Sequence, residues 1–351
     1  KKHGRNISVT GRSAGTDMTG GALSESIILS FTRYMNRLLE LGDDYAVVEP
    51  GMYYRDFEVE TLKKNLILPS YPASRELCAM GGIVANNSGG EKTLKYGKTE
   101  RYLDTIWMVC EDGQERPFSQ ISRADLQQKI TRQDFEGNIY RQMYQLITEN
   151  YEQITKAKPD VTKNSAGYYL WNVYDRQADT FNLAKLITGS QGTLGIITKA
   201  KLKLVRPQKY SKLLIIFLKD MSLVSEISQT VLPLNPESFE TYDDNTFKLA
   251  IKFFPELLRQ IKAGFFKLML KTWPELLMLA EGGIPKLVLL AEFTADNPRT
   301  AAAQAEKAKK LLSEKLGKQV RLRVTRSKEE TEEFWTIRRD SFNLLRKHMR
   351  G

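Results

Sequence analysis

The sequence predicts an α+β protein built from two domains. Its 351 residues are enough for two domains with separate hydrophobic cores. Up to about residue 207, short apolar runs alternate with glycine-rich turns, whereas the following residues contain longer apolar runs and fewer glycines. Arg206-Pro207 ends the last strand of the first part, so we expect domains at residues 1–207 and 208–351.

Apolar spacing predicts the elements of the first domain. Strands are expected at residues 7–10, 45–48, 106–110 and 196–205, and helices at 24–41 and 138–156. Within 198–205, small and apolar residues occupy the even positions, and Lys199, Lys201 and Lys203 occupy odd ones. This alternation is the period of a half-buried strand.

The second domain is expected to be a small layered domain. Strands are predicted at 213–218, 287–293 and 320–325, and helices at 221–232 and 298–316. Asn297-Pro298 and Gly317 mark the two ends of the last helix, and the strand, helix and strand between 287 and 325 form a crossover unit. Charged residues, glycines and prolines interrupt the hydrophobic stretch 265–293, which favours a core helix and strand over a membrane span.

Composition excludes several classes of protein. The net charge is +11, but the basic residues are scattered, which favours a solvated surface over a nucleic-acid site. Two cysteines, Cys78 and Cys110, make neither a disulfide framework nor a zinc site, and His3 and His348 lack the neighbours of a metal site. We therefore expect a cytoplasmic protein without metal, and a peripheral membrane contact and a homo-oligomer stay open.

Three glycine clusters, at residues 11–22, 80–90 and 189–195, are the main functional signal. Small residues let backbone N–H groups converge on an anion such as a pyrophosphate, although plain turns are the alternative for each cluster. The first cluster lacks the lysine of a nucleoside triphosphatase loop. A strand follows the third, where a Rossmann fold requires a helix. Taken alone, residues 49–51 indicate only a turn after a strand.

Together these segments resemble a known flavoprotein family. They are GRSAGTDMTGGA at 11–22, VVEPG at 47–51, PASRELCAMGGIVANNSGGEKTLKYG at 72–97, KNSAGYYLW at 163–171 and GSQGTLGIIT at 189–198, with FETYDDN at 239–245 and FWTIRRDSF at 334–342. The family is the one typified by vanillyl-alcohol oxidase, in the branch of FAD-dependent D-lactate dehydrogenases and glycolate oxidase subunits.

The resemblance implies a PCMH-type, two-lobed FAD-binding domain followed by a smaller, ferredoxin-like α+β cap domain. The FAD diphosphate would lie over residues 13–16, and attachment would be non-covalent because this loop has no histidine or cysteine. The cofactor-binding residues that it implies are Arg12, Ser13, Ala14, Gly15, Thr16, Gly20, Gly21, Pro50, Gly51, Met80, Gly81, Gly82, Ala85, Asn86, Gly89, Gly90, Tyr96, Gly97, Gly192, Thr193, Gly195 and Ile197.

The resemblance also implies the catalytic candidates. Arg338 matches the position associated with a substrate carboxylate, with a surface arginine as the alternative. Lys163 and Tyr168 lie in a stretch that is near the flavin in relatives, with structural packing as the alternative. Relatives carry metal-binding and basic histidines after the cap and a first lobe before the pyrophosphate loop. This chain therefore resembles the middle of a longer protein, with both ends truncated, and a fragment and a naturally reduced form are the two alternatives.

The predicted activity is oxidation of a small 2-hydroxy acid, such as D-lactate or glycolate, by hydride transfer to the flavin. Electrons would pass to a quinone, a cytochrome or an iron–sulfur partner, in the cytoplasm or at the inner face of the membrane. Two alternatives are a flavin-containing transferase similar to alkyl-glycerone-phosphate synthase and a non-catalytic flavin-binding subunit.

Overall fold

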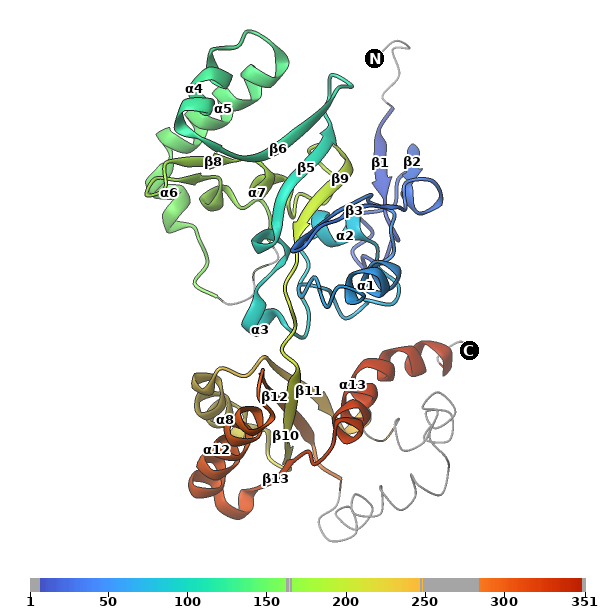
Figure 1. The fold of residues 1–351 in the computed structure, drawn as a ribbon, viewed down its shortest axis with the longest axis vertical. Coiled ribbons are helices and arrows are strands. Elements are labelled where there is room, and N and C mark those ends of the chain that lie inside the picture. The colour runs from blue at the N-terminus through green and yellow to red at the C-terminus, as the bar shows by residue number, and fades with distance from the viewer. Residues whose placement is uncertain (1–6, 162–163, 165, 247, 249–283, 349–351) are drawn as a thin grey trace. The chain divides into compact units, whose positions relative to one another are not determined.

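The computed structural model describes residues 7–161, 164, 166–246, 248 and 284–348 (Figure 1). It divides into two compact units, Lys1–Pro207 and Gln208–Gly351. Each unit has its own hydrophobic core. The chain is therefore a mixed α+β protein of two domains.

The first unit contains a parallel pair of strands and a seven-stranded antiparallel sheet with the order β3-β4-β9-β5-β6-β8-β7 (Figure 1). Its strands are β1 (Val9–Arg12), β2 (Ile27–Ser30), β3 (Leu38–Leu41), β4 (Tyr45–Val48), β5 (Leu103–Val109), β6 (Glu115–Ser122), β7 (Tyr174–Asp175), β8 (Thr180–Asn182) and β9 (Ile196–Lys203). Its α-helices are α1 (Tyr54–Leu62), α2 (Met80–Ala85), α3 (Thr93–Tyr96), α4 (Arg123–Thr131), α5 (Phe135–Glu149), α6 (Tyr151–Lys156) and α7 (Ala184–Ile187). Short 3-10 turns lie at Phe31–Arg33, Thr99–Arg101 and Leu170–Asn172.

Strand β9 lies inside this sheet, paired with β4 on one side and β5 on the other. Ala200 and Leu202 are buried, whereas Lys199 and Lys201 are half-buried, so the predicted alternation is confirmed. Side chains of α1, α2, α5 and α7 pack with the buried side chains of the sheet in one core cluster. Burial of each large apolar side chain there contributes about 1.5–3 kcal/mol.

The helix predicted at residues 24–41 is wrong. This segment forms β2, a 3-10 turn and β3 instead. Ile27, Ile28 and Leu29 are consecutive apolar residues, and the two β-branched isoleucines favour an extended backbone that pairs in parallel with β1. The helix predicted at 138–156 exists as α5 and α6, which are divided at Asn150.

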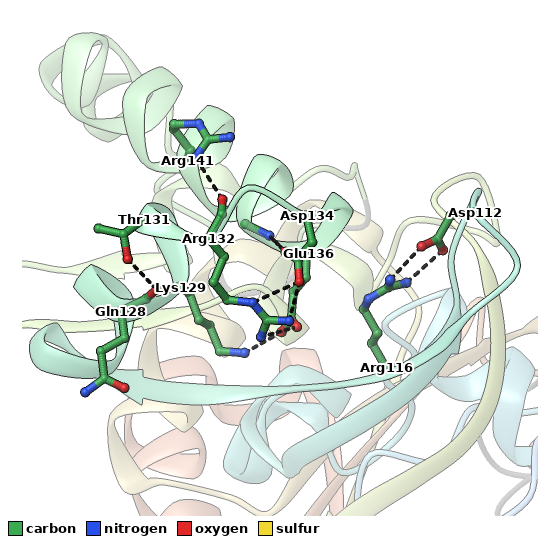
Figure 2. Close-up of polar contacts among 10 residues, drawn as sticks. Asp112, Arg116, Gln128, Lys129, Thr131, Arg132, Asp134, Glu136 and Arg141 are labelled. Carbon is green, nitrogen blue, oxygen red and sulfur yellow. Dashed lines mark hydrogen bonds and ion pairs between the residues drawn. The ribbon is translucent and has the colours of Figure 1, made fainter.

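A polar network fixes the corner between α4 and α5. Lys129 and Arg132 both contact the carboxylate of Glu136, Arg132 at 2.9 Å. Figure 2 shows these side chains pointing toward one another, with Asp134 beside them. Asp134 caps α5 by accepting a hydrogen bond of 2.8 Å from the N–H of Gly137. Because Glu136 is buried, its two cationic partners offset the cost of its desolvation.

The second unit is a four-stranded antiparallel sheet with the order β11-β12-β10-β13 (Figure 1). Its elements are β10 (Tyr210–Leu218), α8 (Val224–Val231), β11 (Ser238–Asp243), β12 (Leu287–Ala295), α12 (Pro298–Leu316), β13 (Val320–Val324) and α13 (Lys328–His348), with 3-10 turns at Met221–Leu223, Leu232–Leu234 and Gly317–Gln319. Strands β12 and β13 flank β10, and α12 joins them as the predicted crossover. This topology is ferredoxin-like.

Helices cover both faces of this second sheet. Leu214 and Ile216 of β10 pack with α8 and α12, while Leu213 and Ile215 pack with Phe334 and Trp335 of α13. The predicted ends of α12 are confirmed, because Asn297 accepts a hydrogen bond of 2.8 Å from the N–H of Arg299 and Gly317 follows the last turn. The helix predicted within 265–283 falls outside the described residues.

Candidate functional site

The glycine clusters of the first unit surround a cavity of about 410 Å³. Its walls come from residues 11–22, from Pro50, from the segment 72–88 and from 191–197. The predicted cofactor-binding residues that line it are Ser13, Ala14, Gly15, Thr16, Gly21, Pro50, Gly81, Gly82, Ala85, Asn86, Gly192, Gly195 and Ile197. The structure thus brings together segments that are far apart in the sequence.

The carbonyl oxygen of Pro50 joins three of these segments. It accepts a hydrogen bond of 2.7 Å from the hydroxyl of Ser13 and one of 2.8 Å from the N–H of Gly81. Gly81 has to be glycine here, because a Cβ would lie 2.5 Å from the Cβ of Pro50. The first cluster and α2 are therefore both fixed to the end of β4.

The third glycine cluster is fixed to the other end of α2. The N–H of Gly189 donates to the carbonyl oxygen of Val84 at 3.1 Å, and the N–H of Gln191 donates to that of Ala85 at 2.8 Å. Gln191 has a positive φ of 54°, which turns the chain along the cavity wall. Helix α2 thus forms the floor between the first and third clusters.

The loop at residues 13–16 presents backbone donors. Among the residues that the structure describes, the N–H groups of Ala14, Gly15 and Thr16 have no hydrogen-bond partner. Gly15 has a φ of +66°, and the guanidinium of Arg12 lies against it, where a Cβ would be 2.6 Å from Nε. Three successive donors of this kind can receive the oxygens of a diphosphate.

Asp17 holds the next part of this loop. Its carboxylate accepts hydrogen bonds from the hydroxyl of Thr19 at 2.6 Å, from the N–H of Thr19 at 3.2 Å and from the N–H of Gly21 at 3.1 Å. These hydrogen bonds, above all the one from the Thr19 hydroxyl, lower the pKa of Asp17. The carboxylate is therefore ionised at neutral pH and closes the loop.

The walls suit a large ligand whose surface is mostly uncharged. Asp17 carries the acidic side chain of the lining, and within the described part of the chain no lysine, arginine or histidine belongs to it. A Cβ at Gly82 would make only ordinary contacts with Ser13, at 3.6 Å, and one at Gly192 would meet nothing within 4 Å. Glycine at these two positions leaves the wall open, so the residues fit the diphosphate and flat rings of FAD.

Several predicted cofactor residues lie outside this lining: Arg12, Gly20, Gly51, Met80, Gly89, Gly90, Tyr96, Gly97 and Thr193. Close backbone packing explains some of these glycines. A Cβ would lie 2.2 Å from the carbonyl oxygen of Phe31 at Gly51 and 2.2 Å from that of Tyr71 at Gly90. Contact of these residues with the cofactor stays a prediction.

Sequence reasoning missed Cys78 and Gln191 as lining residues. Both lie inside the quoted motifs, Gln191 between Gly189 and Gly192 and Cys78 shortly before Gly81, and this nearness to glycines was the available signal. Burial raises the pKa of the Cys78 thiol to about 12, which keeps it neutral. Cys78 thus contributes shape to the wall and is no thiolate nucleophile.

The catalytic candidates lie in different units. Tyr168 belongs to the first unit, where its hydroxyl is 2.6 Å from the hydroxyl of Thr193. Arg338 belongs to α13 of the second unit, where its Nη2 contacts Glu240 of β11 at 3.0 Å. Lys163 lies outside the described residues. The structure therefore places Tyr168 beside the third glycine cluster and gives Arg338 a carboxylate partner.

The described residues contain neither a metal-ligand cluster nor a membrane-spanning helix. Among the described residues, no group of three or more histidine, cysteine, aspartate or glutamate side chains is arranged to hold a metal ion. His3 and the side chain of His348 lie outside that part of the chain. In the same described part, no helix combines the length and the hydropathy needed to cross a membrane.

Comparison with known proteins agrees with this fold and cavity. Residues 2–118 match the family described as FAD binding domain, and residues 208–350 match the family described as FAD linked oxidases, C-terminal domain. A solved structure of alkyldihydroxyacetonephosphate synthase superimposes with a TM-score of 0.63 at 17% identity, covering 97% of this chain and 51% of that one. The fold is therefore that of a two-domain FAD oxidase.

Two curated relatives show the range of the sequence matches. D-2-hydroxyglutarate dehydrogenase of Haemophilus influenzae is 25% identical over 252 residues, which are 70% of this chain and 24% of the relative. Glycolate oxidase subunit GlcD of Bacillus subtilis is 24% identical over 245 residues, 68% of this chain and 41% of the relative. The chain spans about a quarter of the length of four matching D-2-hydroxyglutarate dehydrogenases and 39% of a fifth.

Fold and cavity together define a flavoprotein with a glycine-walled dinucleotide site and a separate ferredoxin-like domain. The chain belongs to the FAD-linked oxidase family with a PCMH-type FAD-binding domain. FAD is its cofactor, and the first unit carries the residues that fit it.

Proposed function

We propose that this protein oxidises a small 2-hydroxy acid to the 2-oxo acid. The cavity at residues 11–22, 50, 72–88 and 191–197 carries the proposal, because it supplies the site for a redox cofactor. The relatives named above act on D-2-hydroxyglutarate and glycolate according to their names, so the substrate class is a 2-hydroxy carboxylate. D-2-hydroxyglutarate, D-lactate and glycolate are the leading candidates.

Bound FAD supplies a ring that accepts a hydride from the carbon bearing the substrate hydroxyl. The contribution of this chain is then to bind and orient. The loop at 13–16 offers its N–H groups to the diphosphate, and the glycine walls allow close approach of the cofactor. Arg338 offers a guanidinium, the group best suited to bidentate binding of a carboxylate.

Glu240 orients Arg338 before substrate binds. The contact of 3.0 Å uses one terminal nitrogen of the guanidinium, and both side chains are half-buried. A substrate carboxylate would then meet an arginine whose position is already fixed. We expect electrons to leave the flavin for a quinone, a cytochrome or an iron–sulfur partner, in the cytoplasm or at the membrane surface.

The test uses the protein expressed from its complete natural coding sequence. Anaerobic addition of D-2-hydroxyglutarate, D-lactate or glycolate should bleach the visible flavin absorbance with one of them. The L enantiomers of the two chiral acids serve as controls and should reduce the flavin more slowly. Bound flavin that no 2-hydroxy acid reduces would reject the oxidoreductase proposal and favour the transferase or the non-catalytic subunit.

A further inference from the structure

Two hydroxyl groups form a hydrogen-bonded pair beside the cavity. The hydroxyl oxygens of Tyr168 and Thr193 are 2.6 Å apart. Thr193 lies between Gly192 and Gly195, which both line the cavity. Tyr168 is 42% exposed, so this residue is accessible beside the third glycine cluster.

The hydrogen bonds of Thr193 determine the direction of this pair. The Thr193 hydroxyl lies 2.6 Å from the carbonyl oxygen of Ser190, which can only accept. Thr193 has a single proton and donates it to Ser190, so Tyr168 must donate to Thr193. The phenolic oxygen of Tyr168 is then left with lone pairs alone, and it acts toward any ligand as a hydrogen-bond acceptor.

Described residues near Tyr168 make contacts of their own. The carbonyl oxygen of Asn164 accepts hydrogen bonds from Lys98 and from the hydroxyl of Tyr169. Gly167 packs against Gly189, where a Cβ would lie 2.6 Å from the carbonyl oxygen. Gly167, the residue before Tyr168, thus lies against the third glycine cluster, which suits a positioning role for Tyr168.

We propose that Tyr168 is a positioning residue that accepts a hydrogen bond from a donor group of the bound ligand. The donor is a hydroxyl or a ring N–H, and it belongs either to FAD or to the 2-hydroxy acid of the proposed function. The chain of hydrogen bonds ends on the Ser190 carbonyl, which cannot take up a proton. Tyr168 thus orients a donor and is no general base.

Three variants and a matched control test this role. Tyr168→Phe removes the acceptor, Thr193→Val removes the group that directs its proton, and Thr193→Ser preserves that group. Tyr210→Phe is the control, because Tyr210 is exposed to 43% and belongs to the second unit. Each purified protein is titrated with FAD, and flavin reduction by the 2-hydroxy acid is followed across pH.

One lost neutral hydrogen bond should weaken binding about 5- to 10-fold. If FAD is the donor, the Kd for FAD rises by this factor in Tyr168→Phe and by a smaller factor in Thr193→Val, where the phenol keeps its lone pairs but its proton is no longer directed away. If the substrate is the donor, KM rises by this factor while the Kd for FAD is unchanged. In both cases Thr193→Ser and Tyr210→Phe resemble the parent protein, and the pH profile of flavin reduction keeps its shape.

Two results would overturn the proposal. Unchanged Kd and KM in both Tyr168→Phe and Thr193→Val would mean that the pair has no ligand. Loss of one limb of the pH profile in Tyr168→Phe would make Tyr168 the base. If no 2-hydroxy acid reduces the flavin of the parent protein, the proposed function is rejected. The role of Tyr168 is then decided by the FAD titration of Tyr168→Phe and Thr193→Val alone.

Discussion

Neighbouring glycines of α2 provide a sharp test of how the cavity is built. Gly81→Ala would place a Cβ 2.5 Å from the Cβ of Pro50 and 2.9 Å from its carbonyl oxygen, so the backbone has to move. We expect loss of the 2.8 Å hydrogen bond to Pro50, about 1 kcal/mol, plus about 1–3 kcal/mol of strain. Alanine regains about 0.5–1 kcal/mol in a helix, which leaves a destabilisation of about 1–3.5 kcal/mol.

Gly82→Ala should have the opposite effect on stability. Its Cβ would make only ordinary contacts, 3.6 Å from Ser13, so the helix gains about 0.5–1 kcal/mol without strain. The new methyl group would project from position 82 toward Ser13, and both positions line the cavity. Crowding of the cofactor by about 1–3 kcal/mol would weaken FAD binding roughly 5- to 150-fold.

Both variants are assayed by thermal unfolding of the flavin-free protein. The folded apoprotein is then titrated with FAD. Gly81→Ala should lower the Tm of the apoprotein by about 2–4 °C for each kcal/mol. Gly82→Ala should raise or preserve that Tm and still bind FAD poorly. A Gly82→Ala protein with normal FAD affinity would refute the assignment of this wall to the cofactor, and a Gly81→Ala protein of unchanged stability would refute the role of Pro50.

Three further variants test other parts of the structure. Glu49→Gln removes a buried carboxylate whose pKa is lowered mainly by its hydrogen bond from Arg37. Because the folded pKa lies below the unfolded one, the carboxylate stabilises the fold above the unfolded pKa, and this contribution is lost as the pH falls. The difference in unfolding free energy between parent and variant should therefore be largest near neutral pH and shrink below about pH 4. Glu136→Ala leaves Lys129 at the α4–α5 corner without its carboxylate, so chemical unfolding should show a loss of about 1–3 kcal/mol, and an unchanged midpoint would contradict the network. Arg338→Lys should raise KM for the 2-hydroxy acid about tenfold with FAD binding intact, and an unchanged KM would remove Arg338 from the substrate site.

Sequence patterns predicted best those elements whose signals are local. The ends of α12 follow from Asn297, Pro298 and Gly317, which act within one turn of the helix. Strand β9 follows from its alternating lysines. The helix prediction for segment 24–41 was wrong because the spacing of its apolar residues also fits a helix. Pairing with β1, another part of the chain, selects strand β2 instead.

The candidate site shows the same limit. Glycine clusters indicated which segments approach a ligand, but they did not distinguish glycines that face the cavity, such as Gly82, from glycines that admit neighbouring backbone, such as Gly90. The direction of the Tyr168 hydrogen bond was equally invisible, because it depends on Thr193 and on the carbonyl of Ser190. Both distinctions depend on contacts between distant residues.

Because the Pro50 carbonyl binds both Ser13 and Gly81, we expect the cofactor site to form late in folding. Ser13, Pro50, Gly81 and Gln191 are brought together from positions up to 178 residues apart, so loop-closure entropy delays formation of the cavity until most of the domain has folded. Any ligand that binds only this assembled state stabilises the whole domain by mass action. Retention of flavin during purification would therefore report the folded fraction of the entire first unit.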